Sequence, residues 1–238
     1  MKYMGSKSRI AKYIVPIIQK YIDDNNIGTY VEPFVGGANI IDKIRCENKI
    51  GYDNNKYLIS FFVKLQEGWN PLQDIEMTKE LYVDIKNNKD NYPDHIVALA
   101  GFCAAYNAKW FGGYAGIVNT KIGTVRDYYD ESVRNVLKQI GNLKDVLFVT
   151  KDYKDISIPK NSLLYCDPPY ANTTKYKDNF NHDEFWDWVR NKSKDNIILV
   201  SEYNAPDDFK CIWQKESTIT LDKNSRSKAV EKLFVCIK

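Results

Sequence analysis

Apolar residues first recur at helical spacing near the start of the chain. The isoleucines between positions 10 and 18, together with Tyr21, fall on one face of a helix that we expect from about Ser8 to Asp23. The Asn-Asn-Ile-Gly stretch at 25–28 breaks this pattern. The chain therefore opens with an amphipathic helix.

Short apolar runs with turn residues between them follow this helix. The predicted order is strand (29–34), glycine turn (35–39), helix (40–46), strand (49–53) and helix (56–66). Asn54 is expected to cap the last of these helices. A strand, turn, helix and strand in this order indicate a βαβ unit. The sheet should then be parallel, with ligand-binding loops at its carboxyl edge.

The pattern changes near Gly68 and later returns. Between 70 and 128 it predicts helices at 78–86 and 94–106, then a stretch rich in glycine and aromatic residues with no clear period. The later elements are helices at 131–140 and 183–192 and strands at 146–150, 162–167, 196–203 and 232–238. We therefore predict the α/β class, with a Rossmann-like doubly wound core (1–69 and 129–238) and a smaller, mainly helical insert (70–128).

The amino-acid composition excludes only a few classes of protein. The net charge of +3, from 34 basic and 31 acidic residues, permits nucleic-acid binding without arguing for it. Five cysteines form no CxxC pair, and the two histidines lie far apart, so we expect free thiols and no metal site. Neither a signal peptide nor a membrane-spanning run is recognisable, which predicts a cytoplasmic protein without a membrane partner.

Two stretches at strand ends carry candidate chemistry. The glycine turn Val35–Asn39 lets a ligand approach the backbone closely, and Asp53 ends the next strand, where an acid can accept hydrogen bonds from ribose hydroxyls. The second stretch is Asp167-Pro168-Pro169-Tyr170, directly after an apolar run. Prolines cannot continue a central strand, so the strand should end at Asp167. The acid and the ring of Tyr170 should then lie in a conformationally restricted loop at the edge of the sheet. A nicotinamide enzyme would need a GxGxxG run, which this turn lacks.

The order of these motifs resembles the amino-group methyltransferases that use S-adenosylmethionine. With KYMGSK at positions 2–7 and YVEPFVGGAN at 30–39, the chain is similar to the Dam-type (D12 class) DNA adenine methyltransferases. The resemblance covers the N-terminal third and 162–170 well, and LVSEYNAP and SRSKAVEKLFV more loosely. It is weakest across 70–128, where that family keeps its DNA-recognition elements.

The resemblance implies roles for individual residues. Tyr3 would pack on the cofactor adenine, Phe34, Gly36 and Gly37 would surround its methionine part, and Asp53 would bind its ribose. The implied cofactor site comprises Tyr3, Lys7, Glu32, Pro33, Phe34, Gly36, Gly37, Ala38, Asn39, Asp53, Asn54 and Asp167. The implied catalytic set is Asp167, Pro168, Pro169 and Tyr170. Two departures concern the fit of the cofactor: Ala38 stands where many members have a second glycine, and Tyr3 replaces a tryptophan.

The implied reaction moves a methyl group to the N6 amine of an adenine flipped out of double-stranded DNA. Asp167 and the Pro168 carbonyl could each accept one N–H of the amine, and Tyr170 could stack on the base. The expected DNA-facing residues are Lys109, Trp110, Tyr114, Lys121, Arg126, Arg226 and Lys228. For Trp110, a place in the core of a small subdomain is an equally good interpretation.

Alternatives stay open at this point. They are methylation of RNA or of a cytosine amine, a DNA-binding relative that has lost catalysis, and a nucleotide-dependent oxidoreductase. The family implies a monomer. The DNA sequence recognised and a companion restriction nuclease are both left open by the residues.

Overall fold

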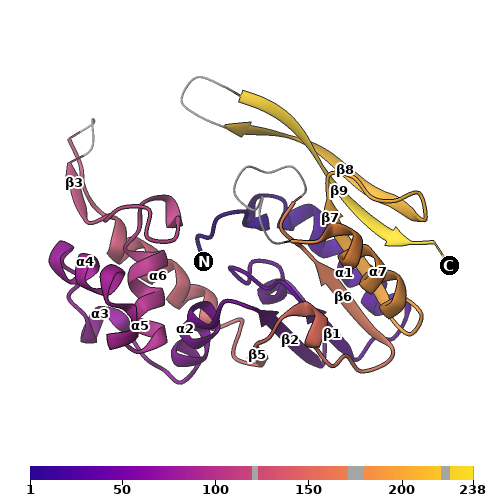
Figure 1. The fold of residues 1–238 in the computed structure, drawn as a ribbon, viewed down its shortest axis with the longest axis horizontal. Coiled ribbons are helices and arrows are strands. Elements are labelled where there is room, and N and C mark those ends of the chain that lie inside the picture. Colours follow the sequence, from indigo (N-terminus) through magenta and orange to yellow (C-terminus); the bar gives the residue numbers. More distant parts are fainter. Residues whose placement is uncertain (120–122, 171–179, 221–225, 238) are drawn as a thin grey trace.

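The computed structural model describes residues 1–119, 123–170, 180–220 and 226–237, with side chains left out at 217–220 and 226–229. Its centre is a seven-stranded sheet in the order β5-β2-β1-β6-β7-β9-β8 (Figure 1). The first five strands in this order are parallel, whereas β9 is antiparallel to both neighbours. The parallel part winds outward in both directions from β1, which is the Rossmann arrangement predicted from the sequence.

The elements follow the predicted alternation closely. The strands of the sheet are β1 (Thr29–Glu32), β2 (Asn48–Asp53), β5 (Val146–Thr150), β6 (Ser162–Cys166), β7 (Ile197–Glu202), β8 (Phe209–Thr220) and β9 (Arg226–Cys236). The helices are α1 (Ala11–Asp24), α2 (Lys56–Gln66), α3 (Pro71–Asp74), α4 (Lys79–Asn87), α5 (Asp94–Ala98), α6 (Tyr128–Ile140) and α7 (His182–Lys192). A separate hairpin joins β3 (Ile117–Asn119) to β4 (Val125–Asp127).

Both faces of the sheet are covered by helices, because its strands are apolar on both sides. On β1, Tyr30 faces the core beneath α1 and α2, whereas Val31 faces a second core beneath α7. Ile14 of α1 and Phe185 of α7 are each fully buried in these two cores. The sheet is thus rigidly held, and its carboxyl edge offers a fixed platform for the loops.

The two ends of the sheet carry different additions (Figure 1). Beyond β5, helices α3 to α5 gather beside α2 and α6, and the β3–β4 hairpin projects from that group. At the other end, β8 and β9 run past the end of β7 as a two-stranded ribbon, since β7 pairs with β9 only up to Lys232. The segment 70–128 is mainly helical, as predicted, and the boundaries of a separate recognition unit there stay a prediction.

Two local predictions were wrong, and two elements were missed. The segment 40–46 forms only a 3-10 turn at Ile41–Lys43, because Ile44 returns to an extended conformation. Asn55, and not Asn54, caps α2, with its side-chain oxygen accepting from the N–H groups of the first helical turn. The long strand β8 and the small β3–β4 hairpin were both missed, since neither has a continuous apolar run.

Candidate active site

A cleft of about 1700 Å³ opens at the carboxyl edge of the parallel strands. Its walls come from the loops after β1, β2, β5, β6 and β7, from the N-terminal segment and from one side of the insert. Ligand pockets for one drug-sized molecule usually measure roughly 300–1,000 Å³. The cleft is therefore larger than a usual site for one such molecule. Of the predicted cofactor and catalytic residues, all except Ala38 line it.

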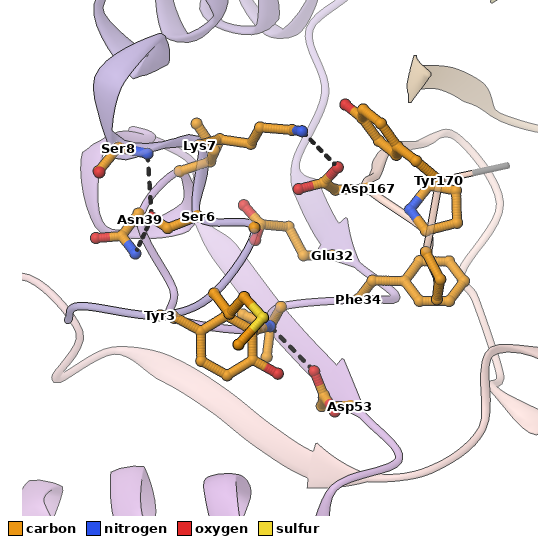
Figure 2. A pocket seen from close by; sticks show the side chains of 18 of the residues that line it. Tyr3, Ser6, Lys7, Ser8, Glu32, Phe34, Asn39, Asp53, Asp167 and Tyr170 are labelled. Atoms are coloured by element: carbon orange, nitrogen blue, oxygen red, sulfur yellow. Dashed lines mark hydrogen bonds and ion pairs between the residues drawn. The ribbon is translucent and has the colours of Figure 1, made fainter. Parts of the chain in front are cut away.

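The N-terminal residues 1–7, called the N-terminal strap below, lie across the glycine turn. The Asn39 side-chain N–H group donates to the main-chain oxygen of Met1 and to Ser6 Oγ, each at 2.9 Å. The ring of Tyr3 lies so close to the turn that a Cβ added to Gly36 would stand 3.1 Å from it. These contacts explain why KYMGSK and the turn occur together: the strap brings Tyr3 and Lys7 into the cleft (Figure 2).

Asp53 is joined to the turn through backbone groups. Its two carboxylate oxygens accept the N–H of Gly36 and the N–H of Asn55, both at 3.0 Å. Burial raises the pKa of Asp53, and these two hydrogen bonds oppose the shift. A carboxylate has about four acceptor positions, so two remain for a ligand. Asp53 is therefore fixed in orientation and still able to accept hydroxyl groups.

Ala38 differs from its neighbours in the turn. It is fully buried and adopts a left-handed backbone, with φ of 53°. A non-glycine residue in this conformation costs on the order of 1–2 kcal/mol. This is the position where the resembling family often has glycine. The prediction that Ala38 contacts the cofactor finds no support in its position, because its side chain points away from the cleft into the core.

Asp167 stands directly after β6, at the floor of the cleft (Figure 2). Its Oδ1 lies 3.2 Å from Lys7 Nζ, and both side chains are mostly buried. Burial raises the pKa of Asp167 to about 6, although the Lys7 ammonium lowers it. Near neutral pH this carboxyl group is therefore mainly ionised, but it is close enough to its pKa to respond to small changes in its surroundings.

Tyr170 and Glu231 complete the floor. The Tyr170 hydroxyl donates to Glu231 Oε2 at 2.8 Å, and the ring packs edge-on against Tyr203 with centroids 4.6 Å apart. Lys7 Nζ stands 4.0 Å from the centre of the Tyr170 ring. Pro168 and Pro169 follow the strand in the loop that turns the ring toward these partners. The tetrapeptide thus presents an acid and an aromatic ring to the same cleft.

Sequence reasoning missed several cleft residues. Glu231 is an acid on β9, two residues before the apolar run Leu233–Val235, and its side chain is mostly buried. Asp152 and Tyr153 follow β5, and Phe180 precedes α7. The rings of Tyr153 and Phe180 both pack against Phe34, with centroids 5.2 and 5.9 Å away. Polar and aromatic residues after any parallel strand could have been included on topology alone.

Glu32 also lies at the floor of the cleft, but its side chain is shielded from solvent. Its side chain is almost completely buried, and the Tyr30 hydroxyl donates to Oε1 at 2.8 Å. Burial raises the pKa of Glu32 well above its ordinary value. Pro33 and Asn54 also line the cleft, one after each of the first two strands.

Among the predicted DNA-facing residues whose side chains the structure describes (Lys109, Trp110, Tyr114 and Arg126), none lines the cleft. Trp110 packs against Phe102 and Tyr57, with centroids 4.6 and 5.4 Å away, so the alternative placing it in the subdomain core describes its position. The Tyr114 hydroxyl donates to the main-chain oxygen of Met77 at 2.7 Å. Lys109 is exposed.

The remaining basic residues of that prediction are less fully described. Arg126 is exposed, and its Nε donates to Glu131 at 2.8 Å. Lys121 lies outside the described residues, and the structure gives only the backbone of Arg226 and Lys228, at the start of β9. DNA contacts by any of these residues stay a prediction.

Two general features bear on the site. Within the described ranges, no three His, Cys, Asp or Glu side chains come together in a way that could hold a metal ion. Over the same ranges, every helix is too short or too polar to cross a bilayer.

Fold and cleft together define the class: a Rossmann-like α/β protein that carries the two motifs of the amino-methyltransferases at the carboxyl edge of its sheet. The chain belongs to the D12 class N6 adenine-specific DNA methyltransferase family, whose model matches residues 3–224.

The chain is also similar to individual proteins. The chain is 25% identical over 224 residues to the modification methylase StsI of Streptococcus sanguinis, a match that covers 85% of this chain but only 33% of that protein. It is 26% identical over 220 residues to the type II methyltransferase M.MjaIII of Methanocaldococcus jannaschii, covering 77% of this chain and 75% of the relative. Among solved structures, the rRNA methyltransferase AviRa of Streptomyces viridochromogenes aligns with a TM-score of 0.42 at 11% identity, over 97% of this chain and 85% of that one.

Proposed function

We propose that this protein transfers the methyl group of S-adenosylmethionine to the N6 amine of an adenine flipped out of double-stranded DNA. The observation that carries the proposal is the meeting of both motifs in one cleft: Asp53 and the glycine turn on one side, Asp167 and Tyr170 on the other. Family membership and the type II methyltransferase relatives support DNA adenine as the substrate.

The residues of the cleft fit the cofactor. Asp53 keeps acceptor positions for ribose hydroxyls, and the left-handed Gly36 (φ 46°) has no side chain, so the ring of Tyr3 can lie directly against the turn. Tyr3 and Phe34 offer apolar rings beside the turn. When bound, S-adenosylmethionine supplies an electrophilic methyl group on a sulfonium.

The protein's own residues prepare the amine. An exocyclic amine is a poor nucleophile because its lone pair is delocalised into the ring. The Asp167 carboxylate can accept one of its N–H groups and the Pro168 carbonyl the other, which favours a pyramidal nitrogen. The prolines stiffen this pair of acceptors, so that methyl transfer depends mainly on proximity and orientation.

Tyr170 has a separate task in this proposal. An unstacked adenine loses the support of its neighbours in the duplex, and a ring on one face can replace roughly 1–3 kcal/mol of it. Because Tyr170 is held from two sides by Glu231 and Tyr203, its ring is fixed before the base arrives.

The test is incubation with methyl-labelled S-adenosylmethionine and plasmid DNA free of adenine methylation, followed by digestion to nucleosides. We expect label in N6-methyl-2′-deoxyadenosine from the wild-type protein and far less from an Asp167→Ala preparation. Label in N4-methyl-2′-deoxycytidine, or in RNA offered instead of DNA, would show that the enzyme methylates another amine. No label in any of them, with DNA still bound, would favour an inactive relative.

A further inference from the structure

Glu231 reaches the catalytic floor from an element that the two motifs do not include. It lies on β9, one residue beyond the last pairing with β7, where the ribbon passes the carboxyl edge of the parallel strands. Its side chain is only 14% exposed. A carboxylate in this position must have partners, because burying an unpaired charge is costly.

Its partners are both groups of the predicted active site. Glu231 Oε2 accepts from the Tyr170 hydroxyl at 2.8 Å and lies 3.3 Å from Lys7 Nζ. Lys7 Nζ in turn lies 3.2 Å from Asp167 Oδ1. Two carboxylates therefore share one ammonium, and one of them also holds the aromatic ring beside it.

We infer that Glu231 is a positioning residue for methyl transfer, which anchors Tyr170 through its hydroxyl and shares Lys7 with Asp167. The inference rests on the proposed function. Sharing matters because an ammonium that is fully committed to Asp167 would compete with the target amine for the same carboxylate oxygens. With Glu231 present, Lys7 divides its charge, and Asp167 remains available as a hydrogen-bond acceptor.

Several charged or titratable groups of the described chain interact electrostatically with Asp167. They are Lys7 from the N-terminal strap, Tyr165 and Cys166 on β6, Tyr170 in the following loop, Tyr203 after β7, Glu32 on β1 and Glu231 on β9. Burial raises the pKa of Asp167, Lys7 lowers it, and the negative charge of Glu231 raises it. Removing that charge should therefore lower the pKa of Asp167.

The test compares Glu231→Gln with Glu231→Leu. The glutamine keeps an acceptor for Tyr170 but removes the charge, whereas the leucine removes both. Glu216→Gln is the matched control: it removes the same charge from the other face of the ribbon, where Glu216 is exposed and pairs with Val230. Folding is checked by thermal melts before any rate is measured.

For Glu231→Gln we expect a lower kcat on the plateau. The acidic limb of the pH profile of kcat/KM for this variant should move to lower pH by roughly half a pH unit or more, as expected for loss of a nearby like charge. Glu231→Leu should in addition weaken the fluorescence change of 2-aminopurine placed at the target position, because the ring of Tyr170 is no longer anchored. Glu216→Gln should match the wild type. A Glu231→Gln profile that superimposes on that of the wild type, in both plateau and limb, would overturn the inference.

A measurement without DNA separates this inference from the proposed function. The Asp167 carboxyl carbon can be titrated by carbon-13 NMR in the free protein, with Asp167→Asn identifying its signal. We expect a lower apparent pKa in Glu231→Gln than in the wild type. Equal values would overturn the sharing of Lys7 even in an active enzyme. A wild-type protein that methylates no nucleic acid would instead overturn the proposed function.

Discussion

The floor of the cleft and the insert 70–128 hold their charged groups in opposite ways. At the floor, Lys7, Asp167 and Glu231 come from three separate segments, are mostly buried and contact one another. In the insert, Lys109 is exposed, and Arg126 meets its partner at the surface. Charge that must orient a reacting atom needs fixed geometry and little water, whereas charge that meets a DNA backbone can stay solvated until it binds.

The apolar surface differs in the same way. Exposed aliphatic side chains gather on the β3–β4 hairpin, where Ile117 is 71% and Val125 is 67% exposed. The rings along the cleft wall, such as Phe34 and Tyr153, are instead packed against one another. The comparison predicts that changes at the floor act on the rate of methyl transfer, and changes in the insert act on DNA affinity and site choice.

The largest effect is expected for Asp167→Ala. Removing the acceptor that orients the amine should reduce kcat by about 10²–10⁴-fold, the range of a positioned acid–base group. DNA binding, measured by fluorescence anisotropy, should stay within a few-fold of the wild type. Asp145→Asn, at an exposed position before β5, serves as the control. Loss of DNA binding in parallel with activity would break the separation of the two regions.

Asp53→Ala should have the next largest effect, on cofactor affinity. The loss of a hydrogen bond to a charged group costs about 1.5–3 kcal/mol, or roughly 10- to 150-fold in Kd for S-adenosylmethionine. Isothermal calorimetry on the free protein measures this directly. Unchanged affinity in a folded variant would remove Asp53 from the cofactor site, since its two backbone contacts would then be purely structural.

In the insert, alanine variants of Lys109, Lys121 and Arg126 should separate phosphate contacts from base contacts. Loss of one phosphate contact should lower the slope of log K against log salt by about 0.9 and weaken all DNA alike. Loss of a base contact should relax one position of the methylated site. Lys20→Ala, on the outer face of α1 and paired with Asp24, is the control.

Methylome sequencing of cells expressing each variant checks the recognised site. We expect at least one of the three insert variants to change it. If the site and the salt slope are unaltered in all three, recognition lies outside the insert.

The smallest effect is expected for Ala38→Gly, with Ala108→Gly as its counterpart in the insert. Both alanines are buried with a left-handed backbone, at φ of 53° and 52°. Glycine removes strain of about 1–2 kcal/mol but loses a buried methyl group worth about 0.8 kcal/mol. Stability to urea should therefore change by no more than about 1 kcal/mol at either site. A loss well beyond that at Ala38 alone would mean that its methyl group supports the turn.

Much of the core could be predicted from the sequence because its signals are local. A strand such as Ser162–Cys166 is a continuous apolar run, and the proline pair after Asp167 marks its end. The predictions failed where tertiary contacts determine the local structure. The choice between Asn54 and Asn55 as a cap depends on the backbone direction after β2, and β8 forms only because β9 lies beside it.

The residues of the candidate site also differ in whether local signals or tertiary contacts determine their positions. Asp53 ends one parallel strand and Asp167 follows another, so topology alone brings them to one edge. Glu231 could not be placed there in the same way, because its strand is antiparallel and its position depends on how far the ribbon extends past β7. Trp110 could not be assigned from its type, since an aromatic residue beside glycines serves equally well in a core or on a DNA-binding surface.

The most direct test of the central claim is the single-turnover rate of methyl transfer by Asp167→Asn across pH 5–8. In the wild type the rate should fall as the pH drops through about 6, because burial raises the pKa of Asp167 to about 6 and only the ionised form accepts the amine N–H. Asparagine cannot ionise and can turn an N–H toward the amine, so its rate should be low and independent of this ionisation. A near-normal rate in Asp167→Asn, with the wild-type pH profile retained, would contradict the assignment of Asp167 as the acceptor that orients the target amine.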